Sequence, residues 1–475
     1  MEKSKVSESL LNFIYAINLG CLFYFALLNF FYLILYSLSL IVIYQRFRLL
    51  ELEDFDKLLS AVDLPPISIL VPAYNEEAHI VGNVRSLLTI DYRAIEIIVI
   101  NDGSTDRTLE ILKKAFDLFY IEPAVLKRIE TKPVKMVYHS QNVPNLLVVD
   151  KENGGKSDSL NAGINICRTP FFLTIDADTI VQKDALLHMI RPVLIKRGTA
   201  AGVCIGVAND CKIQFGQMIK VRFPRQILPA IQVVEYLRAF LFGRLGWNYL
   251  GGAVIISGAY GLFNKDAIVE CGGYLTNTVG EDIELIVRIH HHMRKLSKEY
   301  NVQFIPDPAA WTEVPFNVSG WRTQRERWHR GLIDTIWRYR GMLFNPRYGA
   351  VGMISLPFYA IFEMLHPVIQ LFSYFMIALG YYLHVLDMGF ILFFFALTLG
   401  FTLSLSFFAI IIEEVTFRRY RYFRDFLKMV VCAVIESITY YQLQMFWKLE
   451  AFWKFFRGDR SWGSIKREGF KDKDL

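Results

Sequence analysis

Two aspartates, Asp176 and Asp178, lie two residues apart directly after the apolar run Phe171–Ile175. Side chains at i and i+2 of an extended strand point to the same side, so these carboxylates can share one hard cation. Mg²⁺ and Mn²⁺ prefer oxygen ligands and usually keep substrate phosphates or water in their shell. The pair therefore predicts a divalent-metal site against a diphosphate, with Asp178 as the direct ligand and Asp176 acting through ribose or water. An ordinary strand-end turn is the alternative.

Two further carboxylates occupy positions suited to chemistry. Asp102, in the segment NDGSTD, can contact the base or ribose of a nucleotide, or form a turn that caps the next helix. Asp282 follows Gly280 and Glu281 and precedes the helical pattern IELIVRIHHHMRKL. There it can act as a general base for a sugar hydroxyl, or only cap the helix. The run His290–His292 points in different directions around that helix, so we interpret it as surface residues.

The segment QRERW places Gln324, Arg327 and Trp328 at i, i+3 and i+4, on one face of a predicted helix. A guanidinium suits phosphate oxygens and an indole face suits the C–H surface of a sugar, so Arg327 is predicted on the diphosphate and Trp328 on a sugar ring. A basic interfacial helix is the alternative. Lys156, in NGGKS, can approach an anionic ligand at a helix start, although Asp150 at the first-glycine position excludes a Walker A motif.

Alternating strand and helix patterns position these residues. The predicted strands are Ile67–Val71, Ile95–Ile100, Leu146–Val149 and Phe171–Ile175, and the predicted helices are Glu77–Leu88, Thr105–Ala115 and Ser157–Ile166. This alternation predicts a parallel sheet covered by helices on both faces, with ligands bound beyond the carboxyl ends of the strands. Pro72, Tyr74 and Glu76 follow the first strand there. The stretch Phe119–Asn145 has no clear period and is predicted to be a surface insertion.

The chain has 475 residues and 53% hydrophobic residues, and its apolar residues concentrate at two places. As a helix, the first block, Leu10–Ile43, would be about 50 Å long against a hydrocarbon core of roughly 30 Å, so we expect one tilted span preceded by an interfacial turn. Three later segments could also span, after an interfacial stretch. In chain order, the interfacial stretch is Ile354–Leu365 and the segments are His366–Leu386, Gly389–Ile412 and Leu427–Trp447. The number of spans stays open, because three spans would place the basic tail outside.

Charge and cysteine usage narrow the compartment and the partners. The net charge of +6 is too small to indicate a nucleic-acid partner. Arginines instead gather beside the apolar segments, as Arg46 and Arg418 do, and this pattern favours a cytosolic middle domain. The six cysteines have no CxxC spacing, so neither a zinc site nor a disulfide framework is indicated.

Together and in this order, these motifs resemble the processive family-2 glycosyltransferases, which include cellulose, hyaluronan and poly-N-acetylglucosamine synthases. The resemblance runs from about Ile67 to Gly331. It implies an α/β GT-A fold with a Rossmann-like, mostly parallel sheet, a UDP-sugar donor, and inversion at the anomeric carbon with Asp282 as the base. The segment IISGAYGLF resembles the acceptor-binding segment of the family. Where the family usually has threonine before the ED motif, this chain has Gly280.

The expected site follows from these motifs. The catalytic residue is Asp282, the metal ligands are Asp178 and Asp176, the nucleotide-sugar residues are Pro72, Tyr74, Glu76, Asp102, Lys156, Asp176, Asp178 and Arg327, and the acceptor residues are Ser257, Gly258, Glu281, Gln324 and Trp328. The expected cofactor is Mg²⁺ or Mn²⁺. The expected reaction is processive synthesis, with export as a further step, of a β-linked exopolysaccharide. The alternative is transfer of one sugar to a polyprenyl phosphate or a glycolipid.

The expected organisation is a multi-pass protein of the inner (plasma) membrane. It comprises a transmembrane anchor (1–50), a cytosolic GT-A domain with an interfacial QxxRW helix (51–345), C-terminal interfacial and transmembrane helices (346–450) and a basic cytosolic tail (451–475). The expected partners are a UDP-sugar, a glycan or lipid-linked acceptor and the bilayer, with accessory secretion subunits as further candidates.

Overall fold

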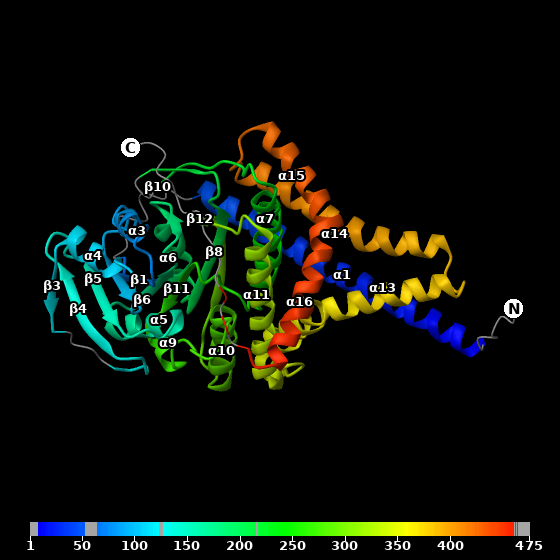
Figure 1. Ribbon diagram of the computed structural model, residues 1–475, viewed down its shortest axis with the longest axis horizontal. Coiled ribbons are helices and arrows are strands. Elements are labelled where there is room, and N and C mark those ends of the chain that lie inside the picture. The colour runs from blue at the N-terminus through cyan, green and yellow to red at the C-terminus, as the bar shows by residue number, and fades with distance from the viewer. Residues whose placement is uncertain are drawn as a thin grey trace.

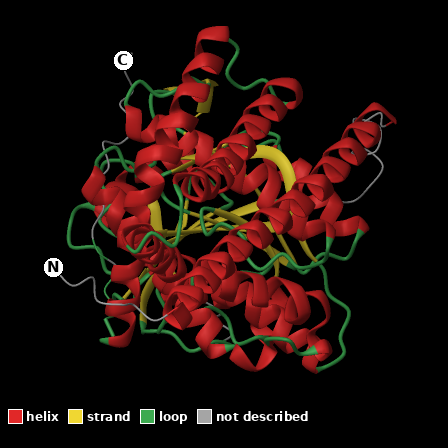
Figure 2. Cartoon of the chain, turned by 90° about the vertical axis from the view of Figure 1, so that its right-hand side faces the viewer, coloured by secondary structure: helices red, strands yellow, loops and turns green. Residues whose placement is uncertain are grey.

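The computed structural model describes residues 8–52, 64–122, 127–214, 217–459, 461 and 463. In Figure 1, a layered α/β body lies on the left and long helices extend from it to the right. Figure 2, viewed from the end of those helices, shows them in front of the strands. The described chain therefore consists of a sheet body and a group of helices that projects from it.

The body is built on a ten-stranded mixed sheet. In order across the sheet, its strands are β3 (Leu118–Ile121), β4 (Val134–Ser140), β5 (Leu146–Lys151), β2 (Ile95–Asn101), β1 (Ile67–Ala73), β6 (Phe171–Ile175), β11 (Tyr260–Asn264), β8 (Ala200–Val207), β12 (Val302–Thr312) and β7 (Thr179–Val181). Strands β5, β2, β1 and β6 run parallel, and β11 lies antiparallel between β6 and β8. A separate hairpin pairs β9 (Lys212–Gln214) with β10 (Gln217–Lys220).

The central strands are buried on both faces. In β1, Ile69 and Val71 belong to one apolar core, whereas Leu70 belongs to the core on the opposite face. A strand covered on both sides reads as a continuous apolar run, which is why its pattern is visible in the sequence. All four predicted strands are confirmed, and the structure extends three of them by one or two residues toward the site.

Helices cover the two faces of the sheet. On one face lie α3 (Ile80–Leu87), α4 (Thr108–Phe116) and α6 (Ala185–Ile195), and on the other lie α5 (Lys156–Ile166), α9 (Lys265–Glu270) and α10 (Glu281–Lys295). The helices predicted to begin at Glu77 and Thr105 both begin three residues later. Asn75 and Asp106 accept hydrogen bonds from nearby backbone N–H groups and hold turns there instead.

The stretch Phe119–Asn145 is not the aperiodic insertion that the sequence predicts. It contributes to β3, which pairs antiparallel with β4, and β4 pairs antiparallel with β5. Phe119 and Tyr120 are both exposed, so the edge strand shows no alternation of apolar and polar residues. The prediction failed because an edge strand buries few side chains and leaves a weak pattern. Residues 123–126 lie outside the described part.

A layer of helices joins the body to the projecting helices. It comprises α7 (Ile227–Arg238), which continues through the π-helical turn η1 (Ala239–Arg244) into α8 (Leu245–Tyr249), and α11 (Val318–Arg338). The projecting group comprises α1 (Glu8–Leu52), α13 (His366–Tyr382), α14 (Met388–Thr416), α15 (Phe423–Ile435), η6 (Glu436–Tyr440) and α16 (Tyr441–Phe456). Short turns lead into it: η2 (Arg340–Met342), η3 (Pro346–Tyr348), η4 (Val351–Ser355), α12 (Leu356–Phe358) and η5 (Tyr359–Met364). Helix α7 contacts α14 and α15, α8 contacts α1, and α11 contacts α16.

Three helices of the described part are long and apolar enough to cross a membrane: Glu8–Arg46, Met388–Thr416 and Phe423–Phe456. A fourth candidate is the pair Val351–Met364 and His366–Tyr382, which bends by 46°. Each predicted C-terminal span corresponds to one of these helices. Helix α1 runs without a break over its whole length, and the interfacial turn expected before the first span stays a prediction.

Candidate functional site

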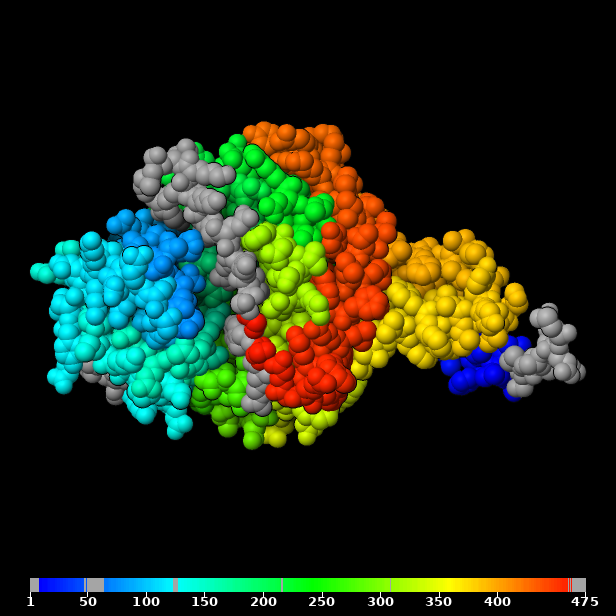
Figure 3. All heavy atoms as spheres, in the orientation of Figure 1, coloured from blue at the N-terminus to red at the C-terminus, as the bar shows by residue number. Residues whose placement is uncertain are grey.

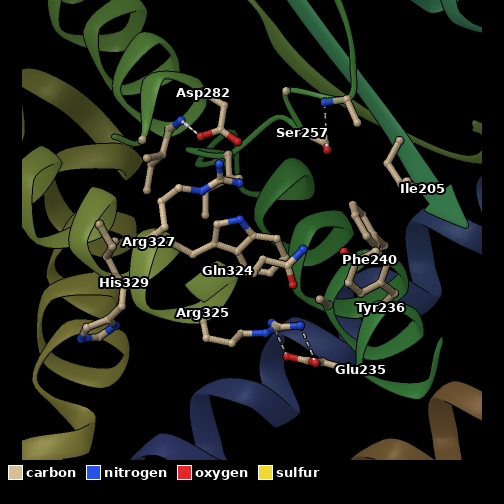
Figure 4. Close-up of a pocket in the computed structure, with 18 of the residues that line it drawn as sticks. Ile205, Glu235, Tyr236, Phe240, Ser257, Asp282, Gln324, Arg325, Arg327 and His329 are labelled. Atoms are coloured by element: carbon tan, nitrogen blue, oxygen red, sulfur yellow. Dashed lines mark hydrogen bonds and ion pairs between the residues drawn. The ribbon is translucent and has the colours of Figure 1, made fainter. Parts of the chain in front are cut away.

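A cavity of about 1000 Å³ opens at the carboxyl ends of the central parallel strands. All the predicted site residues line it: Pro72, Tyr74, Glu76, Asp102, Lys156, Asp176, Asp178, Ser257, Gly258, Glu281, Asp282, Gln324, Arg327 and Trp328. Figure 4 shows several of them arranged around this cavity. The structure thus brings the predicted residues into one space, whereas the role of each residue stays a prediction.

Asp176 and Asp178 follow β6 but lie in different surroundings. Asp176 Oδ1 is 2.5 Å from Nζ of Lys156, and the Asp176 side chain is 27% exposed. Asp178 is 6% exposed. In the described part, no group of three or more His, Cys, Asp or Glu residues could hold a metal ion. A cation bound here would therefore need oxygens from a ligand, and Asp178 suits it better because Lys156 already compensates Asp176.

Lys156 begins α5 and lies among the carboxylates of the site. Its Nζ is 3.7 Å from Oε1 of Glu281 and 3.4 Å from the carbonyl oxygen of Gly258, in addition to its contact with Asp176. Burial opposes the charged form, but Asp176 and Glu281 outweigh it, so the pKa of Lys156 is raised. The site therefore holds a stable cation at a helix N-terminus, where a diphosphate can bind.

Asp102 holds the loop that leads into α5. Its Oδ1 accepts hydrogen bonds from Nζ of Lys151 (2.8 Å) and from the backbone N of Gly154 (3.0 Å). Its Oδ2 accepts one from the backbone N of Gly155 (2.8 Å). The carboxylate therefore fixes the backbone directly before Lys156, a positioning role that the sequence did not reveal. Contact of Asp102 with a base or ribose stays a prediction.

Glu281 and Asp282 are the first two residues of α10, so they lie inside its first turn rather than before it. Burial raises the pKa of Glu281 to about 6, against the lowering effect of Lys156. Asp282 Oδ1 accepts a hydrogen bond from the backbone N of Ile283 (2.8 Å). Its Oδ2 would be 3.8 Å from a Cβ placed on Gly258. The predicted base is thus anchored at one oxygen and close to the predicted acceptor segment.

Packing explains why this chain has Gly280 where the family usually has threonine. A Cβ on Gly280 would lie 2.8 Å from Cα of Gly331, a distance that real Cβ atoms do not show. The two glycines therefore allow the start of α10 to touch α11 directly. This contact brings the carboxylates of α10 close to the QxxRW residues of α11.

Gln324, Arg327 and Trp328 lie on α11 and face the cavity, as their spacing predicts. The guanidinium of Arg325 lies 4.4 Å from the centroid of a Trp328 ring and binds both oxygens of Glu235, at 2.6 and 2.8 Å. The indole is therefore held from one side by an ion-paired arginine. Oε1 of Gln324 is buried without a hydrogen-bond partner among the described residues, and it can accept a hydrogen bond from a ligand in the cavity.

The cavity continues past the predicted site, between the middle helix layer and the projecting helices. Arg238 and Arg244 line this inner part, together with Glu363 and Glu436. Arg238 binds Glu436 through Nη1 (3.2 Å) and Nη2 (2.5 Å), and the Tyr32 hydroxyl donates to Glu363 at 2.6 Å. The sequence motifs did not indicate Arg238, Arg244 or Glu363. Charges inside the apolar segment QVVEYLRAFLFGRLGW were the signal that could have found the two arginines.

The C-terminal segment also reaches the cavity. Arg330, which is 3% exposed, donates to the carbonyl oxygens of Asp459 (2.7 Å) and Ser461 (2.6 Å), and Gly463 lines the cavity. Figure 3 shows the red C-terminal residues beside the green surface of the preceding helices. Helix α16 continues to Phe456, past the predicted start of the basic tail, most of which lies outside the described residues.

The surface position predicted for the histidine run is wrong for His290. This residue is 2% exposed, and its ring hydrogen-bonds to the carbonyl oxygen of Ala253 and the hydroxyl of Tyr300, both at 2.8 Å. Burial lowers the pKa of His290 to about 4, so the ring is neutral. The prediction failed because α10 is buried on two sides, which the polar residues in its sequence concealed.

Comparison with protein families identifies the class. Residues 68–268 match glycosyl transferase family 2, and residues 171–412 match glycosyl transferase family group 2. The second match covers more than half of the chain, so the chain belongs to glycosyl transferase family group 2. The resemblance found in the sequence is confirmed, and the protein is a glycosyltransferase.

Individual relatives are similar over the catalytic part. Poly-β-1,6-N-acetyl-D-glucosamine synthase of Staphylococcus aureus strain COL is 30% identical over 282 residues, which are 59% of this chain and 58% of that protein. The enzyme of the same name from Staphylococcus epidermidis is 28% identical over 275 residues, 57% of this chain and 56% of that protein. The match thus spans less than two thirds of the length of these curated relatives.

One solved structure is similar in fold. It is the mannosyltransferase PcManGT from Pyrobaculum calidifontis in complex with GDP-Man and Mn²⁺, with a TM-score of 0.50 and 14% identity, and the match covers 93% of this chain and 99% of that one. At this identity the likeness concerns the fold alone. The GT-A fold expected from the sequence is confirmed.

Proposed function

We propose that this glycosyltransferase is a metal-dependent, inverting membrane enzyme that moves a sugar from a UDP-sugar to the end of a growing glycan. One observation carries the proposal: a single cavity is lined both by the predicted catalytic residues and by residues of α1, η5, α13, α14 and α16. A glycan whose end lies at Asp282 can therefore extend between helices that are apolar enough to cross a membrane. This continuity supports repeated transfer with passage of the product toward the bilayer.

On the donor side, Pro72, Tyr74, Glu76 and Asp102 surround the nucleoside, while Lys156 and Arg327 bind the diphosphate. The carboxylate pair fits Mg²⁺ or Mn²⁺, with Asp178 as the direct ligand and Asp176 acting through ribose or water. When bound, the ion supplies positive charge against the departing UDP. The similar mannosyltransferase structure contains Mn²⁺, which supports this choice of metal.

On the acceptor side, Asp282 removes the proton from the acceptor hydroxyl as its oxygen attacks the anomeric carbon opposite UDP. This geometry inverts the configuration and gives a β-linkage from an α-linked donor. Trp328 stacks against the acceptor sugar, because an indole face suits C–H surface. Ser257, Gly258, Glu281 and Gln324 complete this side of the cavity.

We propose the domain boundaries expected from the sequence, with the catalytic domain in the cytosol and the enzyme in the inner (plasma) membrane. The position of arginines near the helix ends supports this orientation. Arg46, next to the sheet body, binds Asp307 at 2.9 Å, and Arg419 binds Glu413 at the end of α14. Accessory secretion subunits are proposed partners for a product that leaves the cell.

The test is a donor panel on the purified full chain in nanodiscs. UDP-N-acetylglucosamine comes first because of the names of the relatives, followed by UDP-glucose, UDP-galactose and UDP-glucuronic acid. We expect divalent-cation-dependent release of UDP from one donor and a glycan of high molecular weight. Absence of UDP release with every donor contradicts the proposal.

Transfer of a single sugar to a lipid acceptor is the second candidate. The observation in its favour is that Phe358, Phe362 and Leu405 line the inner part of the cavity, where they could contact an isoprenoid chain. Product size separates the two candidates. A single-sugar product in the lipid extract, with no polymer, would favour this second function.

A further inference from the structure

Arg244 ends the π-helical turn η1 and lines the inner part of the cavity. Its guanidinium carbon lies 4.1 Å from the ring centroid of Phe240 and 5.6 Å from that of Phe304. Stacking on Phe240 restricts the orientation of the planar guanidinium. Because π-helical turns inside α-helices are frequent at functional sites, the position itself merits a chemical explanation.

Two other arginines of this wall form ion pairs with carboxylates, whereas Arg244 has no ion pair with a carboxylate among the described residues. Arg238 binds Glu436 and Arg325 binds Glu235, each through two nitrogen atoms. Nη1 of Arg244 is buried and has no hydrogen-bond partner among the described residues. Burial lowers the pKa of Arg244, while nearby groups that include Tyr359 and Asp282 act in the opposite direction. Arg244 is thus a poorly compensated cation within electrostatic reach of the predicted base.

A purely structural role does not account for this arrangement. Stacking on an aromatic ring is favourable, but it gives the buried Nη1 donor no hydrogen-bond acceptor. A Cβ on Gly243 would meet no atom within 4 Å, and Gly243 and Arg244 both line the cavity. A ligand can therefore approach both residues.

We propose that Arg244 recognises the acceptor glycan by donating hydrogen bonds to a carbonyl oxygen on its sugar, such as the amide oxygen of an N-acyl group. Guanidinium groups only donate, and a carbonyl oxygen accepts two hydrogen bonds in one plane, so the two match. Lys156 and Arg327 already serve the donor diphosphate at the strand ends. This inference rests on the proposed function, since it requires a glycan acceptor. A uronic-acid carboxylate presents the same oxygen chemistry.

The experiment measures transfer from the donor found in the panel to defined oligosaccharides, using the full chain in nanodiscs. The acceptors are oligomers of N-acetylglucosamine, of glucose, and of a uronic acid. The variants are Arg244→Met, Arg244→Lys and Gly243→Leu, and the last fills the open space beside the arginine. The control is Arg340→Met. The guanidinium carbon of Arg340 lies 5.3 Å from the ring centroid of Trp337, but Arg340 is exposed and does not line the cavity.

For Arg244→Met we expect the KM for the carbonyl-bearing acceptor to rise about tenfold or more, while the KM for the donor and for the glucose oligomer stays within about twofold. Arg244→Lys should restore part of the loss, and Gly243→Leu should raise the KM for all acceptors. The oligomer whose KM depends on Arg244 identifies the carbonyl as amide or carboxylate. For Arg244→Met, an equal rise in the KM of every acceptor, or a rise in the KM of the donor, overturns the proposal. If wild-type protein releases no UDP, the proposed function fails instead.

Discussion

Charged side chains are paired differently at the two ends of the cavity. At the strand ends, Asp176 and Glu281 both lie within 4 Å of the ammonium group of Lys156. Farther in, the carboxylates of Glu235 and Glu436 each have their own arginine, bound through two nitrogen atoms. Full pairing satisfies buried charges and stabilises packing, whereas unequal pairing leaves charge for a ligand to compensate. The outer end is therefore arranged for chemistry and the inner wall mainly for structure, with Arg244 as the exception.

The largest effect should come from removing the predicted base at the outer end. Asp282→Asn keeps the shape of the side chain but cannot accept the proton, so transfer should fall by about 10²–10⁴-fold. Binding of UDP in the presence of Mn²⁺, measured by calorimetry, should stay within about twofold.

Asp266→Asn is the control for Asp282→Asn, because Asp266 is 85% exposed at its side chain and does not line the cavity. It should leave both transfer and UDP binding unchanged. Equal losses of UDP binding and transfer in Asp282→Asn would assign that aspartate to the donor rather than to proton removal.

On the inner wall, the expected effect is on stability. Glu436→Gln leaves the partly buried cation of Arg238 without its buried carboxylate, and the loss of one partner of a buried pair costs about 3–5 kcal/mol. The thermal unfolding midpoint should fall clearly, and the double variant with Arg238→Met should recover much of the loss. The control is Glu270→Gln, whose partner Lys298 is about half exposed; that pair should be worth less than about 1 kcal/mol. Equal decreases in the unfolding midpoint for Glu436→Gln and Glu270→Gln would show that the pair of the inner wall stabilises the fold no more than an exposed pair does.

The outer end could be predicted from the sequence because short segments define it. Asp102 and Asp176 follow strands whose apolar runs are visible in the sequence, and topology requires the ends of parallel strands to meet. The inner wall could not be predicted, because its ion pairs join distant residues. Arg238 and Glu436 are 198 positions apart, and Arg325 and Glu235 are 90 apart. Only the packing of the helices brings these partners together.

Local sequence patterns gave wrong predictions where apolar residues are exposed or polar residues are buried. The edge strand β3 exposes apolar residues, and α10 buries the polar ring of His290 between two cores. In both places the sequence presents the wrong polarity for the position. The contact of Gly280 with Gly331 shows the same limit, since the sequence reveals a glycine but not the helix that it must touch.

Within the outer end, the two aspartates of the DAD pair should differ. Asp178→Asn should weaken Mn²⁺-dependent UDP binding by at least about 100-fold, because it removes the proposed direct ligand. Asp176→Asn should weaken it by about tenfold, as expected for a residue that acts through the outer shell. Calorimetric titration of UDP with and without Mn²⁺ measures both. A larger effect for Asp176→Asn would reverse the assignment, and Lys156 would then have to move away from that carboxylate.

The smallest expected effect is the change in stability with pH that the buried carboxyl group of Glu281 causes at the outer end. Burial raises the pKa of Glu281 to about 6 from an ordinary value of 4.5. Between these values the folded protein binds a proton that the unfolded chain releases, so stability from this group is present below about pH 4.5 and is lost as the pH rises through 6. A rise in pKa of this size corresponds to about 2 kcal/mol. Between pH 4.5 and 7, the free energy of unfolding of wild-type protein should therefore fall by up to about 2 kcal/mol more than that of Glu281→Gln. Thermal midpoints over this range measure the difference, and parallel curves would show that Lys156 fully compensates Glu281.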